Sequence, residues 1–133
     1  MVDDFVSNIF ADKLSGKSYI DIGPLFGTVN ETLTITKSFG AASVAGADID
    51  PLNAPSWQKL RERCASFGLN SFMKYSINVD DPDLAAKIGT YDFVYCAGIL
   101  YHTPSPLYTL EHLRSVTSGY LLRHRQLNVG IAR

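Results

Sequence analysis

Short apolar runs alternate with segments of helical periodicity along most of the chain, and this alternation constrains the fold more than any other feature. The strand-like runs lie at 18–22, 43–48, 72–77, 91–97 and 119–122. Strands that are separated by helices pair in parallel through right-handed βαβ units, which place helices on both faces of the sheet. The sequence therefore predicts an α/β fold built on a doubly wound parallel sheet.

Apolar residues spaced three or four positions apart predict the helices between these strands. The helical segments lie at 4–14, 28–40, 56–67, 81–88 and 105–116. Thr28 and Glu31 have the spacing of a capping box, Ser56 is expected to cap the third helix, and Ser105 precedes a first-turn proline. Four residues of the last helix are expected to face the core: Leu107, Leu110, Leu113 and Val116.

The chain of 133 residues has the size of one domain, and we expect a single domain over 1–133. The terminal segment 123–133 allows two interpretations, because its apolar positions alternate as in a strand while basic residues gather in it. It is either a short sixth strand beside the fifth or a terminus that does not order.

Composition argues against several classes of protein. Twelve Lys and Arg against thirteen Asp and Glu give a net charge of −1, which does not support nucleic-acid binding. The two cysteines, Cys64 and Cys96, and the isolated His102 and His112 indicate neither a disulfide framework nor a metal site. The longest apolar run, 93–101, is much shorter than the about 20 residues that span a bilayer. We expect a soluble cytoplasmic protein without a membrane segment.

Residues that directly follow the strands are the candidate binding residues, because ligands bind at the carboxyl ends of parallel strands. After the first strand, Gly23 and Gly27 bracket a tight turn that lets the backbone approach a ligand closely. Asp48 ends the second strand, where a carboxylate can accept hydrogen bonds from both hydroxyls of a ribose. Together these features predict a nucleoside ligand.

The same turn lacks the residues that bind phosphate groups. Leu25 and Phe26 do not fit the GxGxxG pattern, whose second glycine lets the backbone touch a pyrophosphate. The turn also lacks the Lys and the Ser or Thr that follow the last glycine of a P-loop. The expected ligand therefore carries no phosphate at this position, and a nicotinamide-dependent oxidoreductase is the less favoured alternative.

Four segments in this order resemble the motifs of class I S-adenosylmethionine-dependent methyltransferases. They are the turn 21–27, Asp48-Ile49, the segment 76–80, and the segment 91–107 with its Gly-x-Leu-Tyr-His sequence at 98–102. The first motif of the family, Asp-x-Gly-x-x-x-Gly, is matched within 21–27. The resemblance covers about residues 17–122 and implies a Rossmann-like sheet with the strand order 3-2-1-4-5.

The resemblance implies a binding role for nine residues and S-adenosylmethionine as the cofactor. These residues are Asp21, Gly23, Pro24, Gly27, Asp48, Ile49, Asn78, Val79 and Ala97. Ile49 stands where family members pack on adenine, and Val79 adds an apolar wall. Asn78 replaces the usual Asp that contacts the adenine amino group, and its amide oxygen can accept the same hydrogen bond.

Tyr101 and His102 follow the fourth strand, where the resemblance places the transferred methyl group. His102 is the first candidate for a general base, and Tyr101 is the second. The alternative is that both only shape the pocket or bind backbone. The Asn-Pro-Pro-Tyr signature for methylation of adenine N6 or glutamine is replaced by 97–100, so those acceptors are disfavoured.

The expected reaction is methyl transfer to an oxygen or nitrogen nucleophile of a small-molecule acceptor. Two alternatives stay open: a methyltransferase-like module that binds cofactor or partner without turnover, and a tRNA-modifying methyltransferase. Leu25 departs from the family because many members have a second glycine there. The family has seven strands, and this chain stops soon after the fifth. We therefore expect the fifth strand to form an uncovered edge, through which two copies of the chain can pair.

Overall fold

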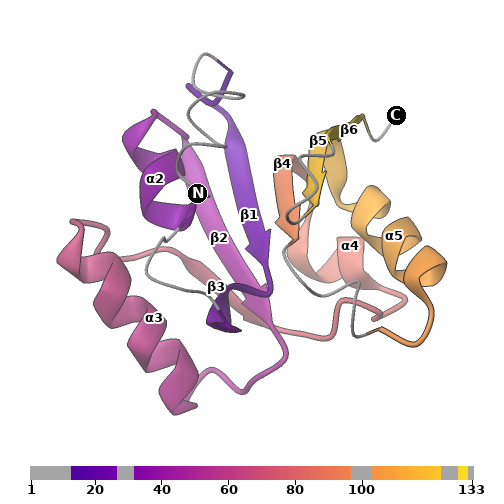
Figure 1. Ribbon diagram of the computed structural model, residues 1–133, viewed down its shortest axis with the longest axis horizontal. Helices are drawn as coiled ribbons and strands as arrows, with labels where there is room; N and C mark the ends of the chain where they lie inside the picture. Colours follow the sequence, from indigo (N-terminus) through magenta and orange to yellow (C-terminus); the bar gives the residue numbers. More distant parts are fainter. Residues whose placement is uncertain (1–12, 27–31, 97–102, 124–128, 132–133) are drawn as a thin grey trace.

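The computed structural model describes residues 13–26, 32–96, 103–123 and 129–131, whose strands form one sheet (Figure 1). The strands are β1 (Ser18–Ile22), β2 (Ser43–Asp48), β3 (Met73–Ser76), β4 (Tyr91–Cys96), β5 (Thr117–Arg123) and β6 (Val129–Ile131). Their order is β3-β2-β1-β4-β5-β6. The first five strands are parallel and β6 is antiparallel to β5. The predicted α/β class and the strand order 3-2-1-4-5 are confirmed.

Helices cover both faces of this sheet. The elements are the 3-10 helix η1 (Pro24–Phe26) and the α-helices α2 (Thr32–Ser38), α3 (Pro55–Ser66), α4 (Leu84–Ile88) and α5 (Pro106–Ser115). In Figure 1, α2 and α3 lie on one side of the strands and α4 and α5 on the other. Among the described helices, none combines the length and the apolar character needed to cross a membrane.

Each face of the sheet has its own hydrophobic core, because successive residues of a strand point to opposite faces. The core under α2 and α3 includes Tyr19, Leu33, Val44, Trp57, Leu60, Cys64 and Phe93. The core under α4 and α5 includes Ile20, Ala45, Leu84, Ile88, Val94, Leu113 and Val116. The central strand β4 contributes to both cores, as expected for a strand that is covered on both faces.

Two expectations about helix ends and faces are wrong. Ser56 does not cap α3: the N-cap residue is Ala54, and the Ser56 hydroxyl donates to Asp50 Oδ2 at 2.6 Å. Leu107 does not face the core, since 77% of it is exposed, whereas Thr109 is fully buried. A helix with 3.6 residues per turn rotates Leu107 by about 120° from Leu113, and the inward stripe therefore runs through Thr109 and Leu113 instead.

The terminal segment contains a strand that pairs with β5. Tyr120 lies opposite Ile131 and Leu122 opposite Val129 in an antiparallel register. This result confirms the strand interpretation of the tail. It also makes the expectation of an uncovered β5 edge wrong, because β6 occupies that edge. A dimer formed at this side of the sheet stays a prediction, with β6 as the outer strand. Most of the expected helix 4–14 and the residues Thr28 and Glu31 lie outside the described residues.

Gly119 allows an irregular pairing between β4 and β5. Tyr91 lies opposite Thr117 and Phe93 opposite Tyr120, so two residues of β5 lie opposite Asp92 alone. A glycine inside a strand often marks such a bulge or a close approach of a neighbouring backbone. A Cβ atom on Gly119 would collide with the carbonyl oxygen of Asp92 and lie 3.3 Å from its carbonyl carbon. Only glycine fits this position without a shift of the β4 backbone.

Candidate functional site

The carboxylate of Asp48 is the centre of the candidate site. Asp48 ends β2 and is 6% exposed. Its Oδ2 accepts a hydrogen bond from the main-chain N–H of Leu25 at 3.0 Å, and its Oδ1 accepts one from Ile49 at 2.7 Å. Burial raises the pKa of Asp48 above its ordinary value, against the opposing effect of these two hydrogen bonds. The carboxylate thus ties the turn after β1 to the end of β2.

The turn after β1 packs tightly on β2. Gly23 has a φ of 93°, a conformation that favours glycine, and its N–H donates to the carbonyl of Ala47 at 2.8 Å. Pro24 is buried, and its Cγ lies 3.3 Å from the position of a Cβ atom on Gly46. A glycine in β2 therefore allows η1 to lie directly against the strand. This turn is in the place that the motif predicts.

The end of β3 completes the row of loops. The main-chain N–H of Ile77 donates to the carbonyl of Asp48 at 2.8 Å, which places Asn78 and Val79 beside the end of β2. Asn78 is exposed, and its Oδ1 accepts a hydrogen bond from the N–H of Asp80 at 2.9 Å. Val79 is half-buried against the core under α4 and α5. The structure therefore brings the loops after β1, β2 and β3 together.

Asp21 lies at a different position from Asp48, on the face of the sheet that α2 covers. Its Oδ2 accepts a hydrogen bond from the Thr32 hydroxyl at 2.6 Å. Burial, and to a lesser degree the charge of Asp21, raise the pKa of Tyr95 to about 12. Asp21 therefore joins β1 to the start of α2, a structural contact that its motif position did not reveal.

Four of the predicted site residues lie outside the described residues. They are Gly27, Ala97, Tyr101 and His102. Their expected roles in cofactor binding and catalysis stay predictions. The described chain resumes at Thr103, the residue directly after His102.

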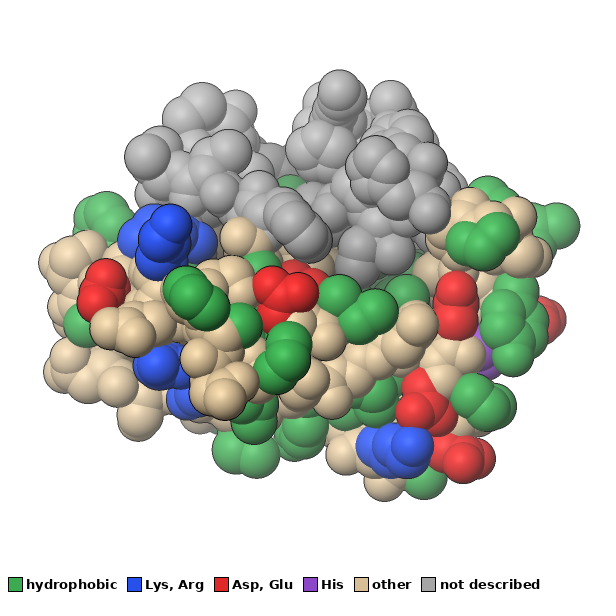
Figure 2. All heavy atoms as spheres, turned by 90° about the horizontal axis from the view of Figure 1, so that it is seen from below, with side chains coloured by type: hydrophobic (Ala, Val, Ile, Leu, Met, Phe, Trp, Pro, Cys, Tyr) green, Lys and Arg blue, Asp and Glu red, His purple; other side chains and the backbone are tan. Residues whose placement is uncertain are grey.

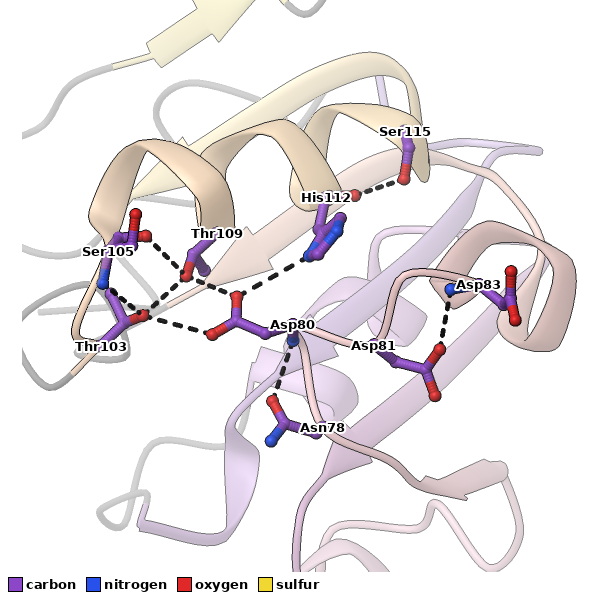
Figure 3. Close-up of polar contacts among 9 residues, drawn as sticks. All are labelled: Asn78, Asp80, Asp81, Asp83, Thr103, Ser105, Thr109, His112 and Ser115. Atoms are coloured by element: carbon purple, nitrogen blue, oxygen red, sulfur yellow. Dashed lines mark hydrogen bonds and ion pairs between the residues drawn. The ribbon is translucent and has the colours of Figure 1, made fainter.

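A polar network that the sequence did not predict joins the loop after β3 to the start of α5 (Figure 3). Asp80 Oδ1 accepts a hydrogen bond from the Thr109 hydroxyl at 2.6 Å, and the Thr103 hydroxyl lies 3.3 Å from Oδ2. The two threonine hydroxyls are 2.8 Å apart. His112 Nδ1 lies 3.7 Å from Asp80 Oδ1. The partners are separated by 23 to 32 positions in sequence, and no periodicity links them.

The acceptor oxygens of Asp48 and the surface around them suit a nucleoside. A carboxylate offers about four lone-pair sites, so two main-chain bonds leave capacity for two ribose hydroxyls. Ile49, next to it, is 58% exposed and offers an apolar surface to a planar base. Figure 2 views the molecule from the side on which the strands end: hydrophobic and acidic side chains lie near the middle of the described surface, and further acidic side chains lie toward its sides together with the Lys and Arg side chains.

Comparison with known proteins identifies the fold. No family model and no curated protein sequence matches the chain. Among solved structures, the chain is similar to a ribosomal protein L11 methylase from Lactobacillus delbrueckii subsp. bulgaricus, with a TM-score of 0.63 and 16% identity over 90% of this chain and 56% of that protein. An O-methyltransferase family protein from Burkholderia thailandensis gives a TM-score of 0.67 with 16% identity over 92% of this chain and 36% of that one.

A third similar structure was determined in the presence of small molecules. The N-terminal domain of EvdMO1, determined in the presence of S-adenosylhomocysteine and D-fucose, gives a TM-score of 0.62 and 24% identity over 90% of this chain and 48% of that one. The chain thus spans between about a third and somewhat more than half of these proteins. From the sheet order and these similarities we conclude that the chain has the fold of class I S-adenosylmethionine-dependent methyltransferases.

Proposed function

We propose that this chain binds S-adenosylmethionine and transfers its methyl group to an oxygen or nitrogen nucleophile of a small molecule. The observation that carries the proposal is the buried Asp48 carboxylate at the end of β2, with the exposed Ile49 directly beside it. A buried carboxylate can accept hydrogen bonds from a diol, and the exposed isoleucine next to it can pack on an apolar ring. The pair therefore favours a ligand that has both. The fold supports the same assignment.

Each loop of the site has a distinct task in this proposal. Asp48 accepts hydrogen bonds from the two ribose hydroxyls, and Ile49 packs on the adenine ring. Asn78 accepts a hydrogen bond from the adenine amino group at the second lone pair of Oδ1, since the first is used by Asp80 N–H. Gly23 and Pro24 shape the turn that faces the amino-acid end of the cofactor.

The reaction needs little chemistry from the protein, because a bound S-adenosylmethionine supplies an activated methyl group on its sulfonium. The chain's contribution is to hold the acceptor nucleophile in line and at short range. His102, which follows β4 in sequence, would remove the proton of a hydroxyl or amine acceptor, and Tyr101 would orient it. If both residues only shape the pocket, the acceptor must be a nucleophile that needs no base.

A small acceptor agrees better with the charges than a nucleic acid does. The net charge of the chain is −1, and the described Lys and Arg side chains in Figure 2 do not gather over the middle of the face. A nucleic-acid partner requires a positive surface that tracks phosphates.

Calorimetric titration with S-adenosylhomocysteine tests the proposal. We expect a dissociation constant in the micromolar range, about −8 kcal/mol of binding free energy, and no heat with NAD. A purified, folded chain that does not respond to S-adenosylhomocysteine contradicts the proposed cofactor. Binding without methyl transfer from radiolabelled S-adenosylmethionine to any compound of a hydroxyl and amine library would favour the non-catalytic module instead.

Replacing Ile49 with serine tests the adenine surface. We expect affinity for S-adenosylhomocysteine to fall about tenfold, because an exposed apolar contact worth about 1.4 kcal/mol is lost. The free energy of unfolding should change by less than about 0.5 kcal/mol, since the side chain is 58% exposed. Leu52, which is 45% exposed in the same connection, provides the control. An equal loss of affinity in Leu52→Ser would show that Ile49 has no specific role.

A further inference from the structure

The network around Asp80 connects two loops that have separate roles in the proposed reaction. Asp80 lies two residues after Asn78 and binds the N-terminal part of α5 through Thr109. Thr103, which follows His102 directly, lies within hydrogen-bond distance of both Asp80 and Thr109. The expected cofactor loop and the expected catalytic segment are therefore linked by three side chains.

Each threonine hydroxyl has one proton, and this determines which group donates to which acceptor in the network. Thr109 donates to Asp80 Oδ1, the shortest of the contacts at 2.6 Å. Its oxygen is then the acceptor for the Thr103 hydroxyl, 2.8 Å away, in preference to the 3.3 Å contact with Asp80 Oδ2. Thr103 Oγ1 in turn accepts the N–H of Ser105 at 3.4 Å. Each threonine hydroxyl thus donates one hydrogen bond, in a series that runs from Ser105 through Thr103 and Thr109 to Asp80.

The burial of Thr109 gives the network its importance. Thr109 is fully buried although it lies on the helix that carries the exposed Leu107. A buried hydroxyl without a partner costs about 1–3 kcal/mol, so Thr109 requires an acceptor. The carboxylate of Asp80 is the closer acceptor at 2.6 Å, and the main-chain carbonyl of Ser105 lies at 3.3 Å. The Asp80 side chain is 27% exposed, and the His112 side chain beside it is 13% exposed.

We infer that Asp80 is a positioning residue: through Thr109 and Thr103 it fixes the backbone that follows His102 relative to the loop that contacts adenine. The inference rests on the proposed function. Asp80 touches neither cofactor nor acceptor in this role. Its main-chain N–H holds Asn78 Oδ1 while its carboxylate holds Thr109, so binding at Asn78 and the placement of Thr103 depend on the same residue. Coupling of this kind is reciprocal. Binding at Asn78 should stabilise the position of Thr103, and a fixed Thr103 should favour binding at Asn78.

Thr109→Val and Thr109→Ser form the test pair. Valine keeps the shape of threonine and removes the hydroxyl, whereas serine keeps the hydroxyl. In the unliganded chain, we expect the amide hydrogen of Ser105 to exchange at least about tenfold faster in Thr109→Val than in the wild type, and at the wild-type rate in Thr109→Ser, as measured by NMR. Unchanged exchange in Thr109→Val would overturn the anchoring role, whether or not the chain binds S-adenosylhomocysteine.

S-adenosylhomocysteine provides the second readout. In the wild type and in Thr109→Ser, we expect its addition to shift the amide signals of Thr103 and Ser105. In Thr109→Val those shifts should disappear while the shifts of Ile49 and Asn78 persist. Shifts at Thr103 that survive in Thr109→Val would overturn the coupling. A ligand that produces no shift at Ile49 in the wild type would instead refute the proposed function.

Asp81 is the matched control for the carboxylate. Asp81 accepts from Lys87 Nζ at 2.7 Å. It also accepts from the N–H of Asp83, and its carboxylate points away from Thr109 (Figure 3), although the charge of His112 acts on Asp81 as well. Asp80→Ala and Asp81→Ala remove the same charge from adjacent positions. We expect faster Ser105 exchange only in Asp80→Ala. Equal acceleration in both variants would assign the effect to loop charge and would contradict the inference.

Discussion

Replacing Asp48 with alanine is expected to abolish measurable binding of S-adenosylhomocysteine. Hydrogen bonds to a charged group contribute about 1.5–3 kcal/mol each, and two ribose hydroxyls would lose such bonds. Even the lower figure for each bond corresponds to a loss of about a hundredfold in affinity. Calorimetric titration of the variant at the concentrations used for the wild type measures this loss directly.

The variant must be separated from a simple loss of structure, because Asp48 also binds the N–H groups of Leu25 and Ile49. Asp48→Asn retains one carbonyl oxygen for these donors, and its thermal unfolding should stay closer to that of the wild type than that of Asp48→Ala. Asp83→Asn removes the same charge from an exposed position and should bind normally. Wild-type affinity in a folded Asp48→Asn variant would contradict the ribose-binding role.

The pH dependence of binding gives an independent signature of Asp48. In the free protein, burial raises the pKa of this carboxyl above 3.8, its ordinary value. Ribose hydroxyls donate to the ionised form, so binding lowers the pKa again, and affinity should fall as the pH drops through the raised value. The same shift stabilises the free protein below pH 3.8, and this contribution is lost as the pH rises through the folded pKa. Asp48→Asn should show neither effect.

The parts of the fold that sequence periodicity predicted are those in which packing follows local pattern. The buried strands β1, β2 and β4 are short and mostly apolar, and Gly68 stops α3 with a φ of 93°. The pairing of β6 with β5 could not be decided from sequence, because a three-residue strand carries too little periodicity. The prediction that Leu107 faces the core is wrong, because the buried stripe of α5 is centred on Thr109 and Leu113.

The candidate site was predictable where a residue directly follows a strand. Asp48 and Ile49 occupy the end of β2 as the motif requires, since the carboxyl ends of parallel strands share one edge. The network of Asp80, Thr103 and Thr109 was not predictable, because its partners meet only through tertiary packing of α5 against the loop after β3. The sequence offered no signal for it, because Thr109 lies outside the apolar stripe that the spacing of the leucines in this helix predicts.

Replacing Gly119 with alanine is expected to cause a large loss of stability. The added Cβ would collide with the carbonyl oxygen of Asp92, which is main chain of the central strand β4 and has no rotamer into which to move. Overpacking costs about 1–3 kcal/mol where side chains can yield, so we expect about 3 kcal/mol or more here. Urea unfolding measures the change, which should lower the melting temperature by about 10 °C.

Gly68→Ala separates this collision from ordinary glycine strain. Gly68 has a φ of 93° and no atom within 4 Å of a Cβ atom placed on it, so its substitution carries only the conformational cost of about 1 kcal/mol. Gly119 has no such φ, and its cost arises entirely from the approach of β4. Equal losses of stability in the two variants would contradict this account. They would mean that β4 and β5 separate at the bulge without cost, so that their close pairing does not require a glycine at position 119.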